Sequence, residues 1–376
     1  MRTHFHFFNE MFLPFSMKAK ELNCVLAIFA VEDFYILDLQ RKYVTAVKEL
    51  NGSLRAYSVL ALCCRETKMP AGSAPCHLAV LLLLSSTPLW AAEISCRNED
   101  GEMVDWFALY KLPKHAKGEI PMLGLEYMYM DTLAPQWQLG KYLINMTQGA
   151  LGQTLKQLYE MYESERNSIA YAIYNDEVPE SDSNSWQRGH TKDQQMLSYN
   201  PGIYSCSIPN IFQADLPNLQ KLCAGSRLPS VPLRHLSKLQ SAQGETFLHF
   251  AKSHLFIDDI YVAWMAQELK TDLLAESWQH SGQKLPSNCS LNYHVYNINL
   301  IGMPLNSTFY SINDHSKWAV SRKSKDQWTC IGDLNRAAEQ AWRSGGFICT
   351  QNEHIYKAFR HLIIHYKNCT NTFTWM

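Results

Sequence analysis

The hydrophobic pattern after residue 92 alternates between short apolar runs and short amphipathic stretches. Residues 104–110 form a nearly continuous apolar run, which predicts a buried strand. Residues 151–162 carry apolar side chains at helical spacing and predict a helix. Further strands are expected at 169–174, 247–251, 293–300, 318–320, 328–331 and 345–349. Strands and helices mixed in this way indicate an α/β fold.

Further helices are expected at 216–228, 233–239 and 260–278, and a helix-like segment surrounds His365. Asp258 and Asp259 precede the longest of these helices, at the end where the helix dipole stabilises carboxylates. We therefore interpret these two acids as capping residues in preference to a metal site.

An apolar run at residues 78–84 is followed by small residues that end at Ala92. The run is too short to span a bilayer, and the segment 69–92 is predicted to be a secretory signal peptide. Residues 1–68 are then interpreted as a doubtful N-terminal extension that lies outside the fold. The alternative is a genuine N-terminal segment, which would bury the signal and change the compartment.

Cysteines and glycosylation sequons agree with a secreted chain. Seven cysteines follow Ala92, and no CxxC pair is present among them, so disulfides are favoured over a zinc site. The odd number predicts that one thiol stays unpaired. Four sequons predict glycosylation at Asn145, Asn288, Asn306 and Asn368.

The charge of the chain depends on its histidines. The formal net charge is −1 at neutral pH with the 14 histidines uncharged. Because histidine titrates near pH 6.5, the chain becomes cationic in an acidic compartment, which would favour a polyanion such as DNA. The alternative is that this histidine content is ordinary and carries no functional meaning.

Two tripeptides of the form His-x-Lys carry the strongest chemical signal. Four such motifs begin at His115, His190, His315 and His365. In His190-Thr191-Lys192 and His315-Ser316-Lys317 the middle residue is a small hydroxyl, which suits a strand and adds a donor near a phosphate. The other two are interpreted as a charged surface loop and a packed or solvated histidine. The chosen pair falls in different predicted halves, 93–240 and 241–376, which suggests two similar halves that meet at one site.

Several longer motifs resemble the deoxyribonuclease II family. They are Val104-Asp105-Trp106-Phe107, Tyr174-Asn175-Asp176, Arg188-Gly189-His190-Thr191-Lys192, Asp314-His315-Ser316-Lys317-Trp318 and Trp328-Thr329-Cys330-Ile331-Gly332-Asp333-Leu334-Asn335-Arg336. The resemblance covers about residues 69–369. It implies a phospholipase D-like fold of two pseudo-symmetric α/β halves, each a mixed sheet flanked by helices. It also implies a lysosomal endonuclease that cuts double-stranded DNA at acid pH, leaves 3′-phosphate ends and uses no metal or other cofactor. A homodimer is a further expectation.

The resemblance also assigns roles to residues. It implies that His315 attacks phosphorus and forms a phosphohistidine, and that His190 protonates the leaving 5′-oxygen. Lys192 and Lys317 would hold the non-bridging oxygens, and Asn335 would orient a histidine or contact a phosphate. The implied disulfides are Cys330–Cys349, Cys289–Cys369 and Cys206–Cys223, with Cys96 left over.

The chain departs from the family pattern after Lys192. Residues 193–196 lead directly to Asn200, where the family has several further strands and the cysteine expected to pair with Cys96. Loss of central strands can cost more than the whole stability of a domain, about 5–15 kcal/mol. The alternative function is therefore an inactive splice form, a secreted glycoprotein that binds DNA or pairs with the full-length enzyme. A third hypothesis is a ribonuclease that uses the substrate 2′-hydroxyl.

Overall fold

The computed structural model describes three short strands near the N-terminus and most of the chain from Ser95 onward. The described ranges are 17–18, 21–22, 25–29, 95–114, 123–163, 170–175, 202–214, 216–226, 232–278, 284–304, 306–370 and 372–376. The predicted signal peptide, His190 and Lys192 lie outside these residues.

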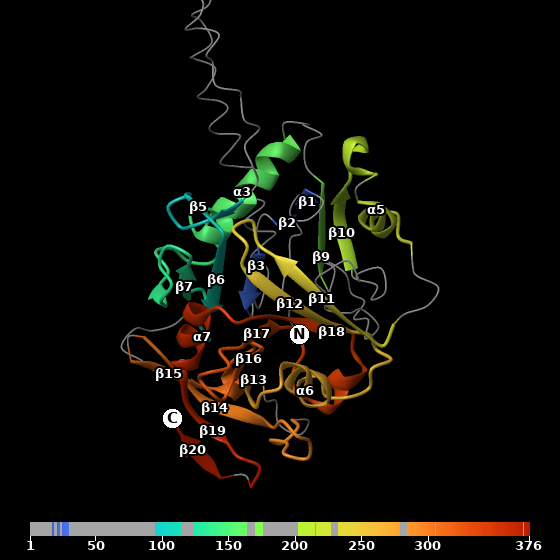
Figure 1. The fold of residues 1–376 in the computed structure, drawn as a ribbon. Coiled ribbons are helices and arrows are strands. Elements are labelled where there is room, and N and C mark those ends of the chain that lie inside the picture. Colours follow the sequence, from blue (N-terminus) through green and yellow to red (C-terminus); the bar gives the residue numbers. More distant parts are fainter. Residues whose placement is uncertain are drawn as a thin grey trace, which may run out of the picture.

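A ten-stranded mixed sheet forms the C-terminal part of the fold (Figure 1). Its strand order is β11-β12-β18-β17-β16-β13-β14-β19-β20, with β15 added to β14. The strands are β11 (Arg234–Gln240), β12 (Thr246–Lys252), β13 (Leu273–Glu276), β14 (Val295–Met303), β15 (Ser307–Tyr310), β16 (Trp318–Ser321), β17 (Thr329–Gly332), β18 (Gly345–Thr350), β19 (Ile363–Lys367) and β20 (Phe373–Trp375). Only the β13–β14 pair is parallel among the pairs of this sheet.

Both faces of the large sheet are buried against other elements. On one face, Trp264 of η3 (Tyr261–Met265) packs with Phe250 and Phe347 of the sheet, and α6 (Ala266–Leu269) continues η3. On the other, Phe359 of α7 (Glu353–Arg360) joins a buried cluster with Ile298. Burial of both faces explains why the central strands read as continuous apolar runs.

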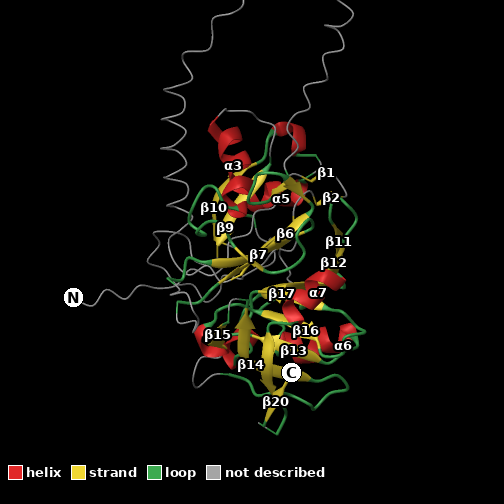
Figure 2. Ribbon diagram, turned by 90° about the vertical axis from the view of Figure 1, so that its left-hand side faces the viewer, coloured by secondary structure: helices red, strands yellow, loops and turns green. Residues whose placement is uncertain are grey.

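The N-terminal part contains smaller sheets and lies on the α7 side of the large sheet (Figures 1 and 2). A four-stranded sheet has the order β3-β6-β7-β8. Its strands are β3 (Val25–Phe29), β6 (Trp106–Lys111), β7 (Tyr127–Asp131) and β8 (Gln138–Leu139). Two-stranded sheets are formed by β1 (Met17–Lys18) with β2 (Glu21–Leu22), by β4 (Cys96–Arg97) with β5 (Met103–Val104) and by β9 (Tyr171–Asn175) with β10 (Gly202–Ser207). The helices here are α3 (Ala150–Glu163), η2 (Asn210–Phe212) and α5 (Pro217–Cys223).

The strand β3 comes from the segment that the sequence interpretation left outside the fold. Residues 25–29 pair in parallel with β6, from Val25 opposite Trp106 to Phe29 opposite Tyr110. β6 therefore has a neighbour on each side, with β7 antiparallel to it on the other.

Most predicted strands and the helix at 151–162 are confirmed, the helix at 260–278 is confirmed only in its first part, and the helices expected at 233–239 and around His365 are wrong. The segment 260–278 is helical only to Leu269, because Lys270 takes the left-handed conformation (φ 54°) and the chain then enters β13. Residues 234–240 form the strand β11, and His365 lies on the strand β19. The capping interpretation is confirmed for Asp259, whose Oδ1 accepts from the backbone N of Tyr261 at 3.0 Å.

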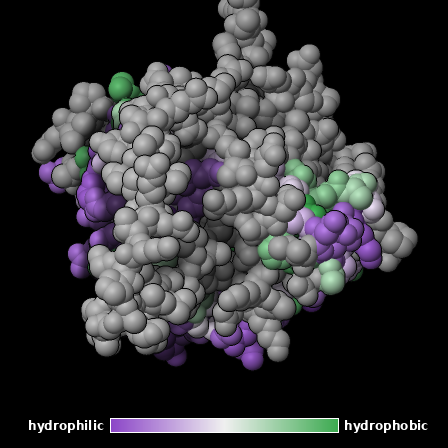
Figure 3. Space-filling view, turned by 90° about the horizontal axis from the view of Figure 1, so that it is seen from above, coloured by the Kyte–Doolittle hydropathy of each residue, from purple (hydrophilic) through white to green (hydrophobic). Residues whose placement is uncertain are grey.

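The described surface is mixed in character. The face shown in Figure 3 carries hydrophilic and hydrophobic areas side by side. Within the described residues, no helix is long and apolar enough to cross a membrane.

Candidate active site

His315 lies at one end of the large sheet, immediately before β16. It follows the short helix η4 (Ser311–Asn313), and Trp318 opens the strand two residues beyond Ser316. Trp318 pairs with Glu276, the last residue of the neighbouring strand β13. The ends of two adjacent central strands therefore place His315.

An indole ring covers the imidazole of His315. The rings of Trp278 and His315 are stacked, with centroids 3.8 Å apart and an interplanar angle of 25°. Two hydrogen bonds hold Trp278 in place. Its indole Nε1 donates to the carbonyl of Ile312 (3.0 Å), and its backbone N donates to Oδ1 of Asn335 (3.1 Å). Asn335 therefore contacts the residue that stacks on His315.

Lys317 is placed beside the same histidine. Its side chain is almost completely buried, and Nζ donates to the backbone carbonyl of His315 at 2.6 Å. An ammonium has three donors, so this contact leaves capacity for a further acceptor such as a phosphate oxygen. A buried cation held at the backbone of the candidate catalytic histidine suits the stabilisation of negative charge that develops on a phosphoryl group.

A buried hydrogen-bond network holds Asp314 and Ser316, the residues on either side of His315. Asp314 Oδ2 accepts from the hydroxyl of Tyr110 (2.5 Å) and from Oγ of Ser316 (2.5 Å), and Nε1 of Trp318 donates to the Tyr110 hydroxyl (3.2 Å). The sequence predicted that the hydroxyl of Ser316 would be a donor near phosphate, whereas it is buried and directed to Asp314. Because Tyr110 belongs to β6, this network joins the N-terminal part to the segment that carries His315.

A second buried carboxyl lies close to Asp314. Glu276 is fully buried, and its Oε2 accepts from Oγ of Ser311 at 2.6 Å. Among the described residues, Oε1 has no hydrogen-bond partner. Burial, and then the charge of Asp314, raise the pKa of Glu276 well above its ordinary value. Burial likewise raises the pKa of Asp314, against its hydrogen bonds from Ser316 and Tyr110.

A buried ion pair holds the loop that carries Asn335. The guanidinium of Arg336 contacts Oδ2 of Asp259 at 2.7 Å and also bonds the side chain of Asn297. Its backbone N donates to Oγ of Ser277 at 3.2 Å. These contacts fix the loop that carries Asn335 next to Ser277, the residue that precedes Trp278.

The described part of the site contains His315, Lys317 and Asn335 together. His190 and Lys192, the other predicted catalytic pair, lie outside the described residues. Sequence reasoning missed Trp278, Glu276 and Tyr110. The first two lie in a segment that the apolar pattern misassigned to a helix, and Tyr110 makes its contact across 204 residues.

The disulfides of the structure are those that the resemblance implied, with one exception. Cys206–Cys223, Cys289–Cys369 and Cys330–Cys349 are all formed. The prediction that Cys96 is left over is wrong, because Cys96 is also disulfide-bonded.

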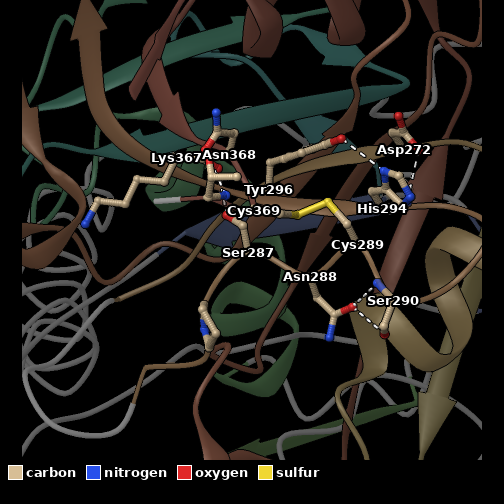
Figure 4. The surroundings of a disulfide bond; sticks show 12 residues. Asp272, Ser287, Asn288, Cys289, Ser290, His294, Tyr296, Lys367, Asn368 and Cys369 are labelled. Carbon is tan, nitrogen blue, oxygen red and sulfur yellow. Dashed lines mark hydrogen bonds between the residues drawn. A yellow bond between two sulfur atoms is a disulfide. The ribbon is translucent and has the colours of Figure 1, made fainter. Parts of the chain in front are cut away.

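Two predicted glycosylation sites flank one disulfide (Figure 4). Asn288 precedes Cys289 and Asn368 precedes Cys369, and each asparagine Oδ1 accepts from the hydroxyl two residues on, at 2.7 Å in both cases. Asn145 is half-buried, and Asn306 is exposed with φ 53°.

The sequence profile of the family described as Deoxyribonuclease II matches residues 95–193 and 193–369 of this chain. The chain belongs to the deoxyribonuclease II family. The matched stretches include the site around His315 and both His-x-Lys motifs that the sequence singled out.

Individual members of the family are similar over most of the chain. Deoxyribonuclease-2-beta of Homo sapiens is 45% identical over 359 residues, which cover 81% of this chain and 99% of that protein. Deoxyribonuclease-2-alpha of Mus musculus is 33% identical, over 76% of this chain and 97% of that protein. Plancitoxin-1 of Acanthaster planci is 28% identical, over 80% of this chain and all of that protein. Similarity to the beta form also agrees with the short motifs Ile94–Asn98 and Tyr204–Pro209, which resemble that form.

The family match is interrupted where the sequence departs from the pattern. The two matched stretches meet at Asp193, directly after the first His-x-Lys motif. The alignment with the human relative spans 359 positions. The 81% of this chain that takes part in it supplies fewer residues than that, because the whole chain has 376. That relative therefore holds residues for which this chain has no counterpart.

Proposed function

We propose that this chain is an acid endodeoxyribonuclease that hydrolyses DNA phosphodiesters without a divalent metal. The observation that carries the proposal is the stacking of Trp278 on His315 beside the buried Lys317, in a chain of the deoxyribonuclease II family. In this proposal the substrate is double-stranded DNA. The relatives are named as deoxyribonucleases, which are enzymes that act on DNA.

The proposed chemistry uses two histidines in turn. The imidazole of His315 attacks phosphorus and forms a phosphohistidine while the bond to the 5′-oxygen breaks. His190 donates a proton to that leaving oxygen and then takes one from the water that hydrolyses the intermediate, so the product ends in a 3′-phosphate. Lys317 and Lys192 stabilise the phosphoryl oxygens, and Trp278 keeps the plane of the His315 ring fixed.

The proposed working pH is acidic because the general acid must be protonated before attack. Histidine protonation also makes the chain cationic, which strengthens binding to a polyanion. The proposed compartment is the lysosome, reached through the secretory pathway with the segment 69–92 as the signal and with glycosylation at the four sequons. A phospholipase D-like arrangement of two pseudo-symmetric halves, and a homodimer, belong to the same proposal.

The test is cleavage of supercoiled plasmid at about pH 5, where histidine is mostly protonated, in excess EDTA. The chain is compared with its His315→Ala variant and with His354→Ala, an exposed histidine on α7 that serves as the matched control. We expect cleavage by the unmodified chain and the control and none by His315→Ala. Cleavage that disappears in EDTA, or survives in His315→Ala, would contradict the proposed mechanism.

The second candidate is an inactive form that binds DNA or a partner. It is favoured by the interruption of the family match at Asp193 and by β9 and β10, which form a sheet of their own. Absence of cleavage by all three proteins, each soluble and folded, would support this candidate over the enzyme.

A further inference from the structure

The hairpin of β19 and β20 presents two aromatic rings to solvent at the edge of the large sheet. The exposed fractions are 53% for Phe373 and 70% for Trp375. Both rings pack edge-on against the imidazole of His365, with centroids 4.9 and 4.8 Å away. The imidazole is itself buried, and its Nδ1 has no hydrogen-bond partner among the described residues. The two rings are therefore held in place by His365 while their outer faces stay open.

Cationic groups gather at the same hairpin. Nζ of Lys367 lies 5.5 Å from the centroid of the Phe373 ring, and in Figure 4 this side chain extends away from the neighbouring disulfide. Burial, and then the charge of Lys284 together with a side-chain contact to it, lower the pKa of Lys367. In the described part of the chain, neither lysine forms an ion pair with a carboxylate. Two like charges brought together without a counter-ion favour an anionic ligand.

The register of the strands places Trp375 at the same end of the sheet as the candidate active site. Trp375 pairs with His365, and His365 pairs with Leu300 of β14. β13 runs parallel to β14, with Ala275 opposite Asn297, so Leu300 lies beyond that pair at the end of the sheet where β13 leads into Trp278. β20 is four strands from β16, the strand that His315 precedes, which is about 19 Å at the usual strand spacing of about 4.8 Å.

We propose that the β19–β20 hairpin binds one strand of DNA outside the candidate active site. Lys284 and Lys367 would contact phosphates, and a base would stack on Trp375 with Phe373 beside it. Alternating cations and exposed aromatic rings are the features with which proteins bind single strands without reading their sequence. The occupant rests on the proposed function, which makes DNA the substrate.

The two aromatic residues of the site lie beyond the matched family stretch. The family match ends at Cys369, whereas Phe373 and Trp375 follow it. A separation of about 19 Å corresponds to about six nucleotides of a B-form strand, at about 3.4 Å each. The hairpin would therefore contact a strand whose scissile phosphate lies at His315.

The test measures binding without cleavage. A dye-labelled oligothymidylate is titrated at acid pH against the full chain carrying His315→Ala, and fluorescence anisotropy is recorded over a series of salt concentrations. On that background we compare Trp375→Ala, Trp375→Phe and the double variant Lys284→Gln/Lys367→Gln. Matched controls are Trp342→Ala, another exposed tryptophan, and Lys323→Gln/Lys325→Gln, two exposed lysines on a turn.

We expect Trp375→Ala to weaken binding by roughly tenfold or more, because stacking on one base has about that effect. Trp375→Phe should retain most of the affinity. The double lysine variant should lower the slope of log affinity against log salt by about 1.4, since each phosphate contact on a single strand contributes about 0.7. The controls should leave the affinity and the slope unchanged.

Equal affinity and slope in the hairpin variants and the controls would overturn the proposal. Loss of binding to phosphatidylserine vesicles in the hairpin variants, with oligonucleotide binding unchanged, would overturn it in favour of an anionic lipid surface. If Trp375→Ala no longer unfolds cooperatively, its loss of binding reflects misfolding. Trp375→Phe, which keeps an aromatic contact with His365, then serves as the folded variant for comparison. A chain that binds DNA through the hairpin and cleaves none would refute the proposed function and leave this site intact.

Discussion

Replacing Glu276 by glutamine tests whether a buried carboxyl makes this protein more stable in acid. Glu276 is fully buried beside Asp314, and its pKa is raised well above the ordinary value by burial and by that charge. Glutamine has the shape of the protonated acid and keeps an oxygen that can accept from Ser311. The change therefore removes the titration and leaves the packing intact.

The direction of the effect follows from proton binding. Between the ordinary pKa of an unfolded glutamate, about 4.3, and the raised pKa of the folded chain, the folded state binds more protons. The free energy of unfolding therefore falls as the pH rises through this range, by up to about 1.4 kcal/mol per pH unit for one group. Below the ordinary pKa both states are protonated, and the full stabilisation is present. Glu276→Gln should lack this decline.

The assay is urea unfolding at a series of pH values from about 4 to 8, which spans the ordinary glutamate and histidine pKa values. We expect the free energies of unfolding of the chain and of Glu276→Gln to agree at the acid end. At the neutral end the variant should be the more stable protein. Asp100→Asn, an exposed carboxylate bonded to Lys141 at 2.6 Å, controls for the loss of one negative charge. A variant that is destabilised equally at both ends would refute the reasoning.

Three further predictions concern contacts around the site. Tyr110→Phe removes a donor to a buried carboxylate and should lower the free energy of unfolding by about 1–3 kcal/mol in urea; an unchanged midpoint would contradict this. Trp278→Ala should lower kcat on DNA by about 100-fold, because His315 loses the ring that fixes its plane, and Trp278→Phe should restore most of it; equal loss in both would argue against stacking. Cys289→Ala with Cys369→Ala opens a loop of 80 residues and should cost about 4 kcal/mol in thermal unfolding, whereas a cost below about 1 kcal/mol would be inconsistent with a loop of this length.

The central strands were predictable because their side chains are buried on both faces. Trp318, Ala319 and Val320 form a short apolar run, and all three are completely buried. The same property caused the error at 260–278, where a buried helix and a buried strand both read as apolar. The boundary between them is Lys270, whose left-handed conformation carries no glycine or proline signal.

The error at β11 has a different origin. This edge strand is largely exposed, so it lacks the alternation that marks a half-buried strand, and Leu236 and Leu239 fall at helical spacing. Seven consecutive pairs with β12 decide the conformation instead. Pairing of this kind is set by tertiary structure, which a local pattern does not contain.

The candidate site was predictable in its motif and not in its surroundings. His315 and Lys317 are two positions apart in the sequence and carry their chemistry in their residue types. Trp278 and Tyr110 contribute through contacts that span 37 and 206 residues, and nothing near either residue in the sequence indicates them.

The bond from Tyr110 to Asp314 also governs when the site can exist during synthesis. The two residues are 204 positions apart, so the carboxyl beside His315 gains this donor only after most of the chain has left the ribosome. An N-terminal fragment cannot contain the site, and a C-terminal fragment would bury an acid that lacks one of its donors. Proteolytic separation of the two parts would therefore remove a hydrogen bond next to His315, even if the cut fell in a distant loop.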